Sequence, residues 1–263
     1  MELGSGKLLR DEPADGVVRL RISNPQRRGA LDHAILDSLA ETVADLDARC
    51  LVITGSDEVF SAGYDLGNLE EREFEEDAEK LVAHPFHDAL EALEAYPYPV
   101  IAQINGHAIG GGLELALICD IRLAARGIRI GMPPAKLGLI YSHTGLRRFL
   151  DVCGPANTAE LFYVGRNVDA DRGLEMGLLN HVVEPQRLDA TTVSIAGEIA
   201  ANAPLSLAGN KRVLRELRNH AAALPEDVER ELIALRESCF RSEDFAEGVR
   251  AFGEKRPPRW QGR

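Results

Sequence analysis

Short apolar runs alternate with amphipathic segments along the first three quarters of the chain. Residues 16–22 alternate between apolar and polar side chains, as a strand does, and residues 50–55 form a continuous apolar run. Between them, residues 32–46 carry apolar side chains at helical spacing. The order strand, helix, strand returns over residues 100–104, 113–119 and 121–124. This alternation predicts an α/β fold.

The last quarter of the chain has a different pattern. From about residue 196 the spacing of apolar side chains is helical, interrupted at Pro204 and Pro225. We therefore expect a core region over residues 1–195 and a helical region over residues 196–263. The helical region carries more apolar positions than one small interior can hold, which indicates contact with a neighbouring chain: Leu205, Leu207, Val213, Leu214, Leu217, Leu232, Ile233 and Leu235.

Charge and cysteine content narrow the class of protein. Acidic residues outnumber basic ones by 42 to 30, which argues against nucleic acid or an anionic membrane as a partner. The sequence has neither an apolar leader nor an apolar run of membrane-spanning length, so we expect a cytoplasmic protein. The four cysteines show no C-x-x-C spacing, and we expect no metal site; Cys50 and Cys119 should pack in the core.

Two glycine-bearing segments are the strongest chemical signal. Residues 60–66 read FSAGYDL, and residues 110–114 read GGGLE after an apolar run and the turn pair Asn105-Gly106. A glycine at the start of a helix leaves its N–H free at the positive end of the helix dipole and lets a ligand approach the backbone. If both segments direct an N–H at one point, they form an oxyanion hole.

These segments, together with others, resemble the crotonase superfamily, which includes the enoyl-CoA hydratases and isomerases. The resemblance runs almost end to end, through the segments NPQRRGAL at 24–31, NGHAIGGG at 105–112, LGL at 137–139, MGLLNHVV at 176–183 and AFGEKRP at 251–257. It implies a crotonase-type spiral of ββα repeats with a C-terminal helical region that forms trimers. It also implies an acyl-CoA thioester as the substrate.

The resemblance assigns roles to several residues. It implies that the backbone N–H groups of Tyr64 and Gly111 form the oxyanion hole, and only the amide of Tyr64, not its side chain, is then needed. Glu114 matches the first catalytic glutamate of the family, within an otherwise apolar helix. A carboxyl at that position can exchange protons with the substrate.

One departure from the hydratase pattern changes the expected reaction. Hydratases carry a second glutamate about twenty residues after the first, and this chain has Pro134 at that position. The run LGLIYS at 137–142 instead resembles methylmalonyl-CoA decarboxylases, which places Tyr141 where it could orient a departing carboxylate. Tyr141 could equally be a core tyrosine, and the neighbouring His143 is ambiguous in the same way.

The remaining expectations concern coenzyme A, which would enter as part of the substrate, so no separate cofactor is expected. Arg27 and Arg28 lie on a loop that borders CoA in the family, and Lys255 matches a lysine that reaches the nucleotide. The resemblance also places Ala62, Gly63, Asp65, Leu66 and Pro133 beside the bound thioester. The acidic stretch 70–80 matches a family segment that covers the acyl pocket.

Three interpretations follow. We favour an enzyme that decarboxylates a malonyl-type acyl-CoA through an enolate held in the oxyanion hole. The first alternative is an enoyl-CoA isomerase or weak hydratase that uses Glu114 alone. The second is a catalytically inactive scaffold that binds acyl-CoA. A homotrimer or a dimer of trimers is expected in each case.

Overall fold

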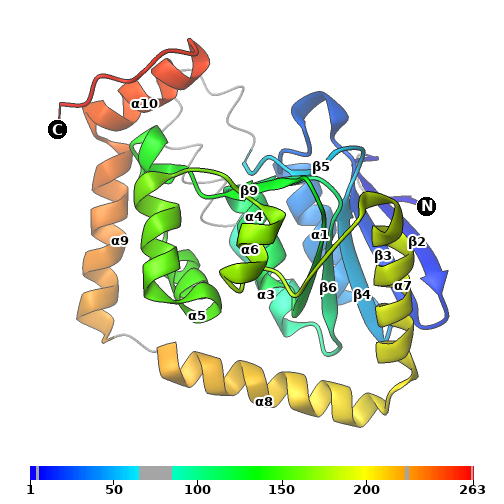
Figure 1. Cartoon of the computed structure of the whole chain (residues 1–263). Coiled ribbons are helices and arrows are strands. Elements are labelled where there is room, and N and C mark those ends of the chain that lie inside the picture. Colours follow the sequence, from blue (N-terminus) through cyan, green and yellow to red (C-terminus); the bar gives the residue numbers. More distant parts are fainter. Residues whose placement is uncertain (4–5, 65–84, 223–224, 262) are drawn as a thin grey trace.

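The computed structural model describes residues 1–3, 6–64, 85–222, 225–261 and 263 (Figure 1). The predicted cover over residues 70–80, and the predicted site residues Asp65 and Leu66, lie outside these ranges.

The larger of two sheets forms the centre of the fold. It has seven strands in the order β1-β2-β3-β4-β6-β8-β11. The first three strands pair antiparallel, and β3 to β11 pair parallel. Their bounds are β1 Glu2–Leu3, β2 Leu8–Ala14, β3 Val17–Ile22, β4 Cys50–Gly55, β6 Val100–Ile104, β8 Ile121–Ala125 and β11 His181–Val183. The buried strands β4 and β6 are the continuous apolar runs that a sheet covered on both faces requires.

The smaller sheet gives the fold its repeat. Its strands follow the order β10-β9-β7-β5, with bounds β5 Val59–Ser61, β7 His107–Ile109, β9 Arg129–Gly131 and β10 Val168–Asp169. Strands β4, β6 and β8 of the large sheet are each followed by one strand of the small sheet, and helices come after β5 and β7. The ββα repeats and the α/β class expected from the sequence are therefore confirmed.

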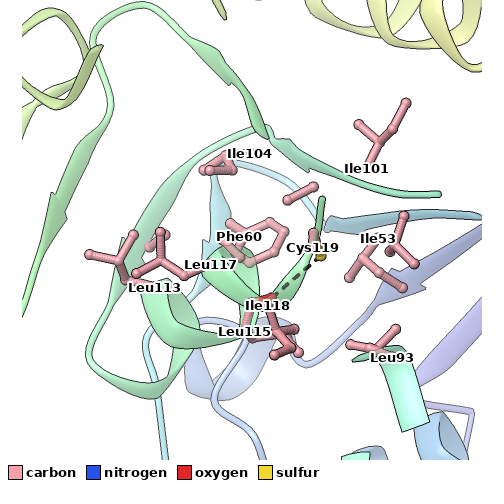
Figure 2. Close-up of a cluster of buried hydrophobic side chains, with 14 of the residues drawn as sticks. Ile53, Phe60, Leu93, Ile101, Ile104, Leu113, Leu115, Leu117, Ile118 and Cys119 are labelled. Carbon is pink, nitrogen blue, oxygen red and sulfur yellow. Dashed lines mark hydrogen bonds between the residues drawn. The ribbon is translucent and has the colours of Figure 1, made fainter. Parts of the chain in front are cut away.

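Helix α4 (Gly111–Ile118) is buried along its whole length, including Glu114. Apart from Glu114 its side chains are apolar on every side, as is typical of a helix in the interior of a domain. Figure 2 shows its side chains meeting those of β4 and β6, with the Cys119 thiol donating to the Leu115 carbonyl at 3.4 Å. Burial raises the pKa of the Cys50 and Cys119 thiols to about 12, so both stay protonated and pack as expected.

The other helices surround this core. The predicted helix over 32–46 is α1, capped by the Asp32 carboxylate, which accepts from the Ile35 amide at 3.0 Å. Helix α1 spans His33–Ala44. The helices that follow it, up to residue 201, are α3 Pro85–Ala95, α5 His143–Ala159, α6 Ala170–Glu175 and α7 Pro185–Ala201. The short helical segments are η1 Pro25–Arg27, η2 Pro134–Leu137 and η3 Glu160–Val164. In the described part of the chain, no helix is long and apolar enough to cross a bilayer.

Three helices complete the chain: α8 (Pro204–Ala222), α9 (Glu226–Phe240) and α10 (Glu243–Gly253). Helix α7 crosses the predicted boundary at residue 195 and lies against the large sheet. Helix α8 then extends along the edge of the molecule to α9, which runs beside α5 (Figure 1). The chain thereby returns to the body of the same molecule, and α10 contacts the turn η2.

Candidate active site

The two glycine segments meet because of strand order. Strands β5 and β7 are parallel neighbours, so the segments that follow them leave the sheet at one edge. Gly63 has a φ of +93°, in the region that glycine alone adopts readily. A Cβ at this position would lie 2.8 Å from the Ile109 carbonyl oxygen and 3.2 Å from the Gly111 amide nitrogen. Glycine at position 63 therefore allows the first segment to pack against the amide of the second.

Two backbone amides are available at this point. Gly111 is the first residue of α4, so its N–H has no acceptor within the helix. The Leu31 amide donates to the Gly63 carbonyl at 2.7 Å, which fixes the peptide that carries the Tyr64 amide. Among the described residues, neither the Tyr64 nor the Gly111 N–H has a hydrogen-bond acceptor. Both amides can therefore bind a ligand oxygen.

The Tyr64 side chain also belongs to the site, which the sequence analysis did not expect. A methyl group on Gly111 would lie only 3.0 Å from Tyr64 Cζ, so the ring covers this glycine. Phe86 of α3 supports the ring edge to face, with the centroids 4.9 Å apart. The Tyr64 side chain also interacts with that of Tyr141. The ring of Tyr64, and not its amide alone, therefore lies at the site.

Glu114 is held by two partners. The Tyr141 hydroxyl donates to Oε2, and Arg148 Nη1 of α5 donates to Oε1 at 2.7 Å. Glu114 is only 2% exposed, and a buried carboxylate without a cation would strongly destabilise the fold. Arg148 supplies that positive charge. Both carboxylate oxygens are thus engaged within the protein.

The two tyrosines remain protonated at neutral pH. Burial, followed by the negative charge of Glu114, raises the pKa of Tyr64 and of Tyr141 well above the ordinary tyrosine value. Tyr141 packs against Phe162 with a ring-centroid distance of 5.5 Å, so its orientation is fixed. The site therefore presents neutral hydroxyl groups beside the two free amides.

A cavity of about 100 Å³ opens between these groups. Six of the predicted residues lie on its wall: Ala62, Gly63, Tyr64, Gly111, Pro133 and Tyr141. Pro134 also lines it, at the position where a hydratase has its second glutamate. Glu114 does not line the cavity, because it lies behind the tyrosine hydroxyls.

The C-terminal helices close the cavity from the same chain. Arg236 and Phe240 of α9 and Phe245 of α10 form the wall on that side. Arg148 and Arg236 were both missed by the sequence analysis. Glu114 could have indicated that such an arginine exists, because a carboxylate buried in an apolar helix requires a positively charged partner. Helix α5, which packs against α4, carries that partner, Arg148.

The other predicted residues lie outside the cavity wall. The Arg27 and Arg28 side chains are exposed, although the Ala62 amide donates to the Arg28 carbonyl at 3.1 Å, which keeps this loop beside the site. Lys255 is exposed just after α10. His143 begins α5, and its Nε2 lies 3.2 Å from Oε1 of Glu229 on α9. This contact links the C-terminal region to the core.

Comparison with known proteins agrees with this geometry. The enoyl-CoA hydratase/isomerase family profile matches residues 12–263. The 2,3-dehydroadipyl-CoA hydratase of Escherichia coli is 31% identical over 94% of this chain and 96% of its own length. The methylmalonyl-CoA decarboxylase of the same bacterium is 30% identical over 90% and 91%.

A solved structure extends the comparison to three dimensions. Methylmalonyl-CoA decarboxylase in complex with 2-nitronate-propionyl-CoA superimposes with a TM-score of 0.89 at 27% identity, covering 98% of this chain and 99% of that one. The family profile spans nearly the whole sequence. Common descent with that family therefore explains the ββα repeats and the paired amides. The chain belongs to the enoyl-CoA hydratase/isomerase family, the crotonase superfamily, and resembles both its hydratases and its methylmalonyl-CoA decarboxylases.

Proposed function

We propose that this enzyme decarboxylates a malonyl-type acyl-CoA. The observation that carries the proposal is the absence of any carboxylate from the cavity wall formed by the described residues. Hydration and isomerisation both need a group that moves a proton to or from the substrate, and in the family pattern that group is a glutamate. Glu114 has both oxygens bound by Tyr141 and Arg148, and Pro134 occupies the second position.

Decarboxylation suits the groups that do line the cavity. The thioester carbonyl oxygen binds to the Tyr64 and Gly111 amides. The bond between the α-carbon and the carboxylate breaks, CO2 leaves, and the electron pair passes to the thioester as an enolate. The two amides stabilise the oxyanion without rearranging, each by roughly 3 kcal/mol. The enolate carbon then takes up a proton from water to give the product thioester, and the hydroxide that remains combines with CO2 to form bicarbonate.

Tyr141 would orient the substrate in this reaction. Tyr141 lines the cavity, and the hydrogen bond that its hydroxyl donates to Glu114 fixes the direction of the ring. Glu114 then acts as a positioning residue that holds Tyr141, and Arg148 balances its charge. We further propose that Arg27, Arg28 and Lys255 bind the CoA phosphates outside the cavity, where their exposed side chains can reach anionic groups.

A second candidate is an enoyl-CoA isomerase or weak hydratase that uses Glu114 alone. It is favoured by relatives such as the E. coli 2,3-dehydroadipyl-CoA hydratase, which is as similar in sequence as the decarboxylase. For this reaction Tyr141 would have to release Glu114 so that the carboxylate could reach the substrate.

A panel of CoA thioesters analysed by mass spectrometry separates the candidates. We expect malonyl-CoA or methylmalonyl-CoA to lose the mass of one CO2, and crotonyl-CoA to gain water slowly or not at all. Loss of one acid–base partner typically removes a factor of about 10² to 10⁴ from such a rate. Rapid hydration of crotonyl-CoA without any loss of CO2 would contradict the proposal. Binding without conversion of any thioester would indicate an inactive scaffold.

The assembly is a separate proposal. Helix α8 exposes a row of large apolar side chains, with Leu205 89%, Val213 57%, Leu214 68% and Leu217 66% exposed. An apolar face of this kind marks an interface. We expect light scattering to give three or six times the chain mass of 28.7 kDa. Leu214→Glu combined with Leu217→Glu should dissociate the assembly, and a monomeric unmodified protein at micromolar concentration would refute the trimer.

A further inference from the structure

Arg236 places a positive charge at the cavity wall, and the reaction described above makes no use of this charge. It extends from α9 to the wall that also contains Gly111 and Tyr141. Its Nε is shielded from solvent and has no hydrogen-bond partner among the described residues. Within the same part of the chain, its guanidinium forms no ion pair with an acidic side chain. A buried donor in this state costs about 1–3 kcal/mol, so it requires an explanation.

Arg148 has an anionic partner, whereas Arg236 has none among the described residues. Both arginines lie beside the tyrosine pair, but Arg148 donates to Glu114 at 2.7 Å. Arg236 and Tyr64 line the same cavity, and the positive charge of Arg236 acts against the rise that burial causes in the pKa of Tyr64. The charge of Glu114 is already balanced by Arg148. Among the residues that the structure describes, Arg236 thus lacks an anionic partner, and the cavity that it lines has room for one.

The size of the cavity limits what that anion can be. The paired amides of Tyr64 and Gly111 receive the thioester, and the cavity beside them has a volume of only about 100 Å³. A group that reaches Arg236 from the thioester must therefore be part of the acyl chain. We propose that Arg236 binds the carboxylate of a carboxyl-bearing acyl thioester and so determines which acyl-CoA enters. This inference rests on the proposed function, because it deepens the choice of substrate.

The loss of the carboxylate charge during decarboxylation determines whether Arg236 contributes to substrate binding or to the rate. The carboxylate is charged in the bound substrate but becomes neutral CO2 as the carbon–carbon bond breaks. An ion pair with Arg236 therefore stabilises the bound substrate more than the transition state. Arg236 is then a specificity-determining residue whose loss raises KM, while the Tyr64 and Gly111 amides provide the rate acceleration.

Binding selectivity tests the inference without requiring turnover. Succinyl-CoA and butyryl-CoA have acyl chains of equal carbon number, and only the former carries a carboxylate. Loss of CO2 from succinyl-CoA would not yield an enolate, so it serves as a stable probe. We expect the unmodified enzyme to bind succinyl-CoA more tightly in calorimetry. Arg236→Gln should reduce this preference by about 10- to 100-fold, the range for a hydrogen bond to a charged group.

Matched variants give the control. Arg230 lies on the same helix with an exposed side chain, so Arg230→Gln should leave the preference unchanged. Arg236→Lys keeps the charge and should retain part of the preference. Equal weakening of both thioesters in Arg236→Gln would mean that Arg236 contacts the CoA moiety, and this result would overturn the inference. The absence of any preference in the unmodified enzyme would overturn it as well.

The binding test of Arg236 can be interpreted whichever reaction the enzyme catalyses. If malonyl-type thioesters are not decarboxylated but the preference depends on Arg236, only the proposed function fails. If they are decarboxylated and the preference is unaffected by Arg236→Gln, only the present inference fails. Where malonyl-CoA is turned over, Arg236→Gln should raise KM without lowering kcat, and a fall in kcat at constant KM would contradict a role in selection.

Discussion

Replacement of Gly111 by proline is expected to lower kcat by about 10² to 10³, the effect of removing one oxyanion-hole donor in other enzymes. Gly111 is the first residue of α4, a position where proline is tolerated because its missing N–H has no helical partner. The substitution therefore deletes the donor and keeps the helix. Single-turnover kinetics with the substrate identified by the thioester panel measures the loss.

Gly111→Ala is the matched control. It keeps the N–H and adds the same Cβ, which would lie 3.0 Å from the Tyr64 ring and displace it slightly. The difference between the alanine and proline variants then reports the donor alone. Equal rates in the two variants would show that the Gly111 amide does not bind the oxyanion. Circular dichroism should show both variants folded.

Elements with a strong local signal could be predicted from the sequence. Strands β4 and β6 and helix α4 are continuous apolar runs, and the structure places them close to their predicted bounds. Apolar spacing predicted the helix over residues 32–46, and in the structure α1 begins at His33, after the Asp32 cap. The small sheet was harder, because β5, β7 and β9 have three residues each, too few for a periodic pattern. Their arrangement came from the family resemblance.

The glycine segments predicted the backbone of the site better than its side chains. Positive φ at Gly63 and the free amide of Gly111 follow from residue type and position. The side-chain network depends on contacts between distant parts of the chain. Arg148 lies 34 residues beyond Glu114, and Arg236 lies on a helix whose charges resemble those of any solvated surface. No local pattern shows that α9 returns to the cavity.

Two alternatives for Tyr141 were left open by the sequence: a core tyrosine or a residue of the site. In the structure the ring packs against Phe162, and the residue also lines the cavity. Removal of this hydroxyl therefore has a stability component and a functional component. Turnover and unfolding free energy, measured on the same variant, separate the two components.

Tyr141→Phe is expected to reduce turnover on the order of a hundredfold, because the substrate and the neighbouring Tyr64 hydroxyl lose the group that orients them. The unfolding free energy should fall by about 1–3 kcal/mol, since Glu114 Oε2 loses its donor. Tyr96→Phe is the matched control: its hydroxyl bonds only with the backbone of Ala48, remote from the cavity. That variant should lose comparable stability in urea titrations and keep full turnover. If Tyr141→Phe retained the turnover of the unmodified enzyme, Tyr141 would be a core residue and the decarboxylase proposal would lose its orienting group.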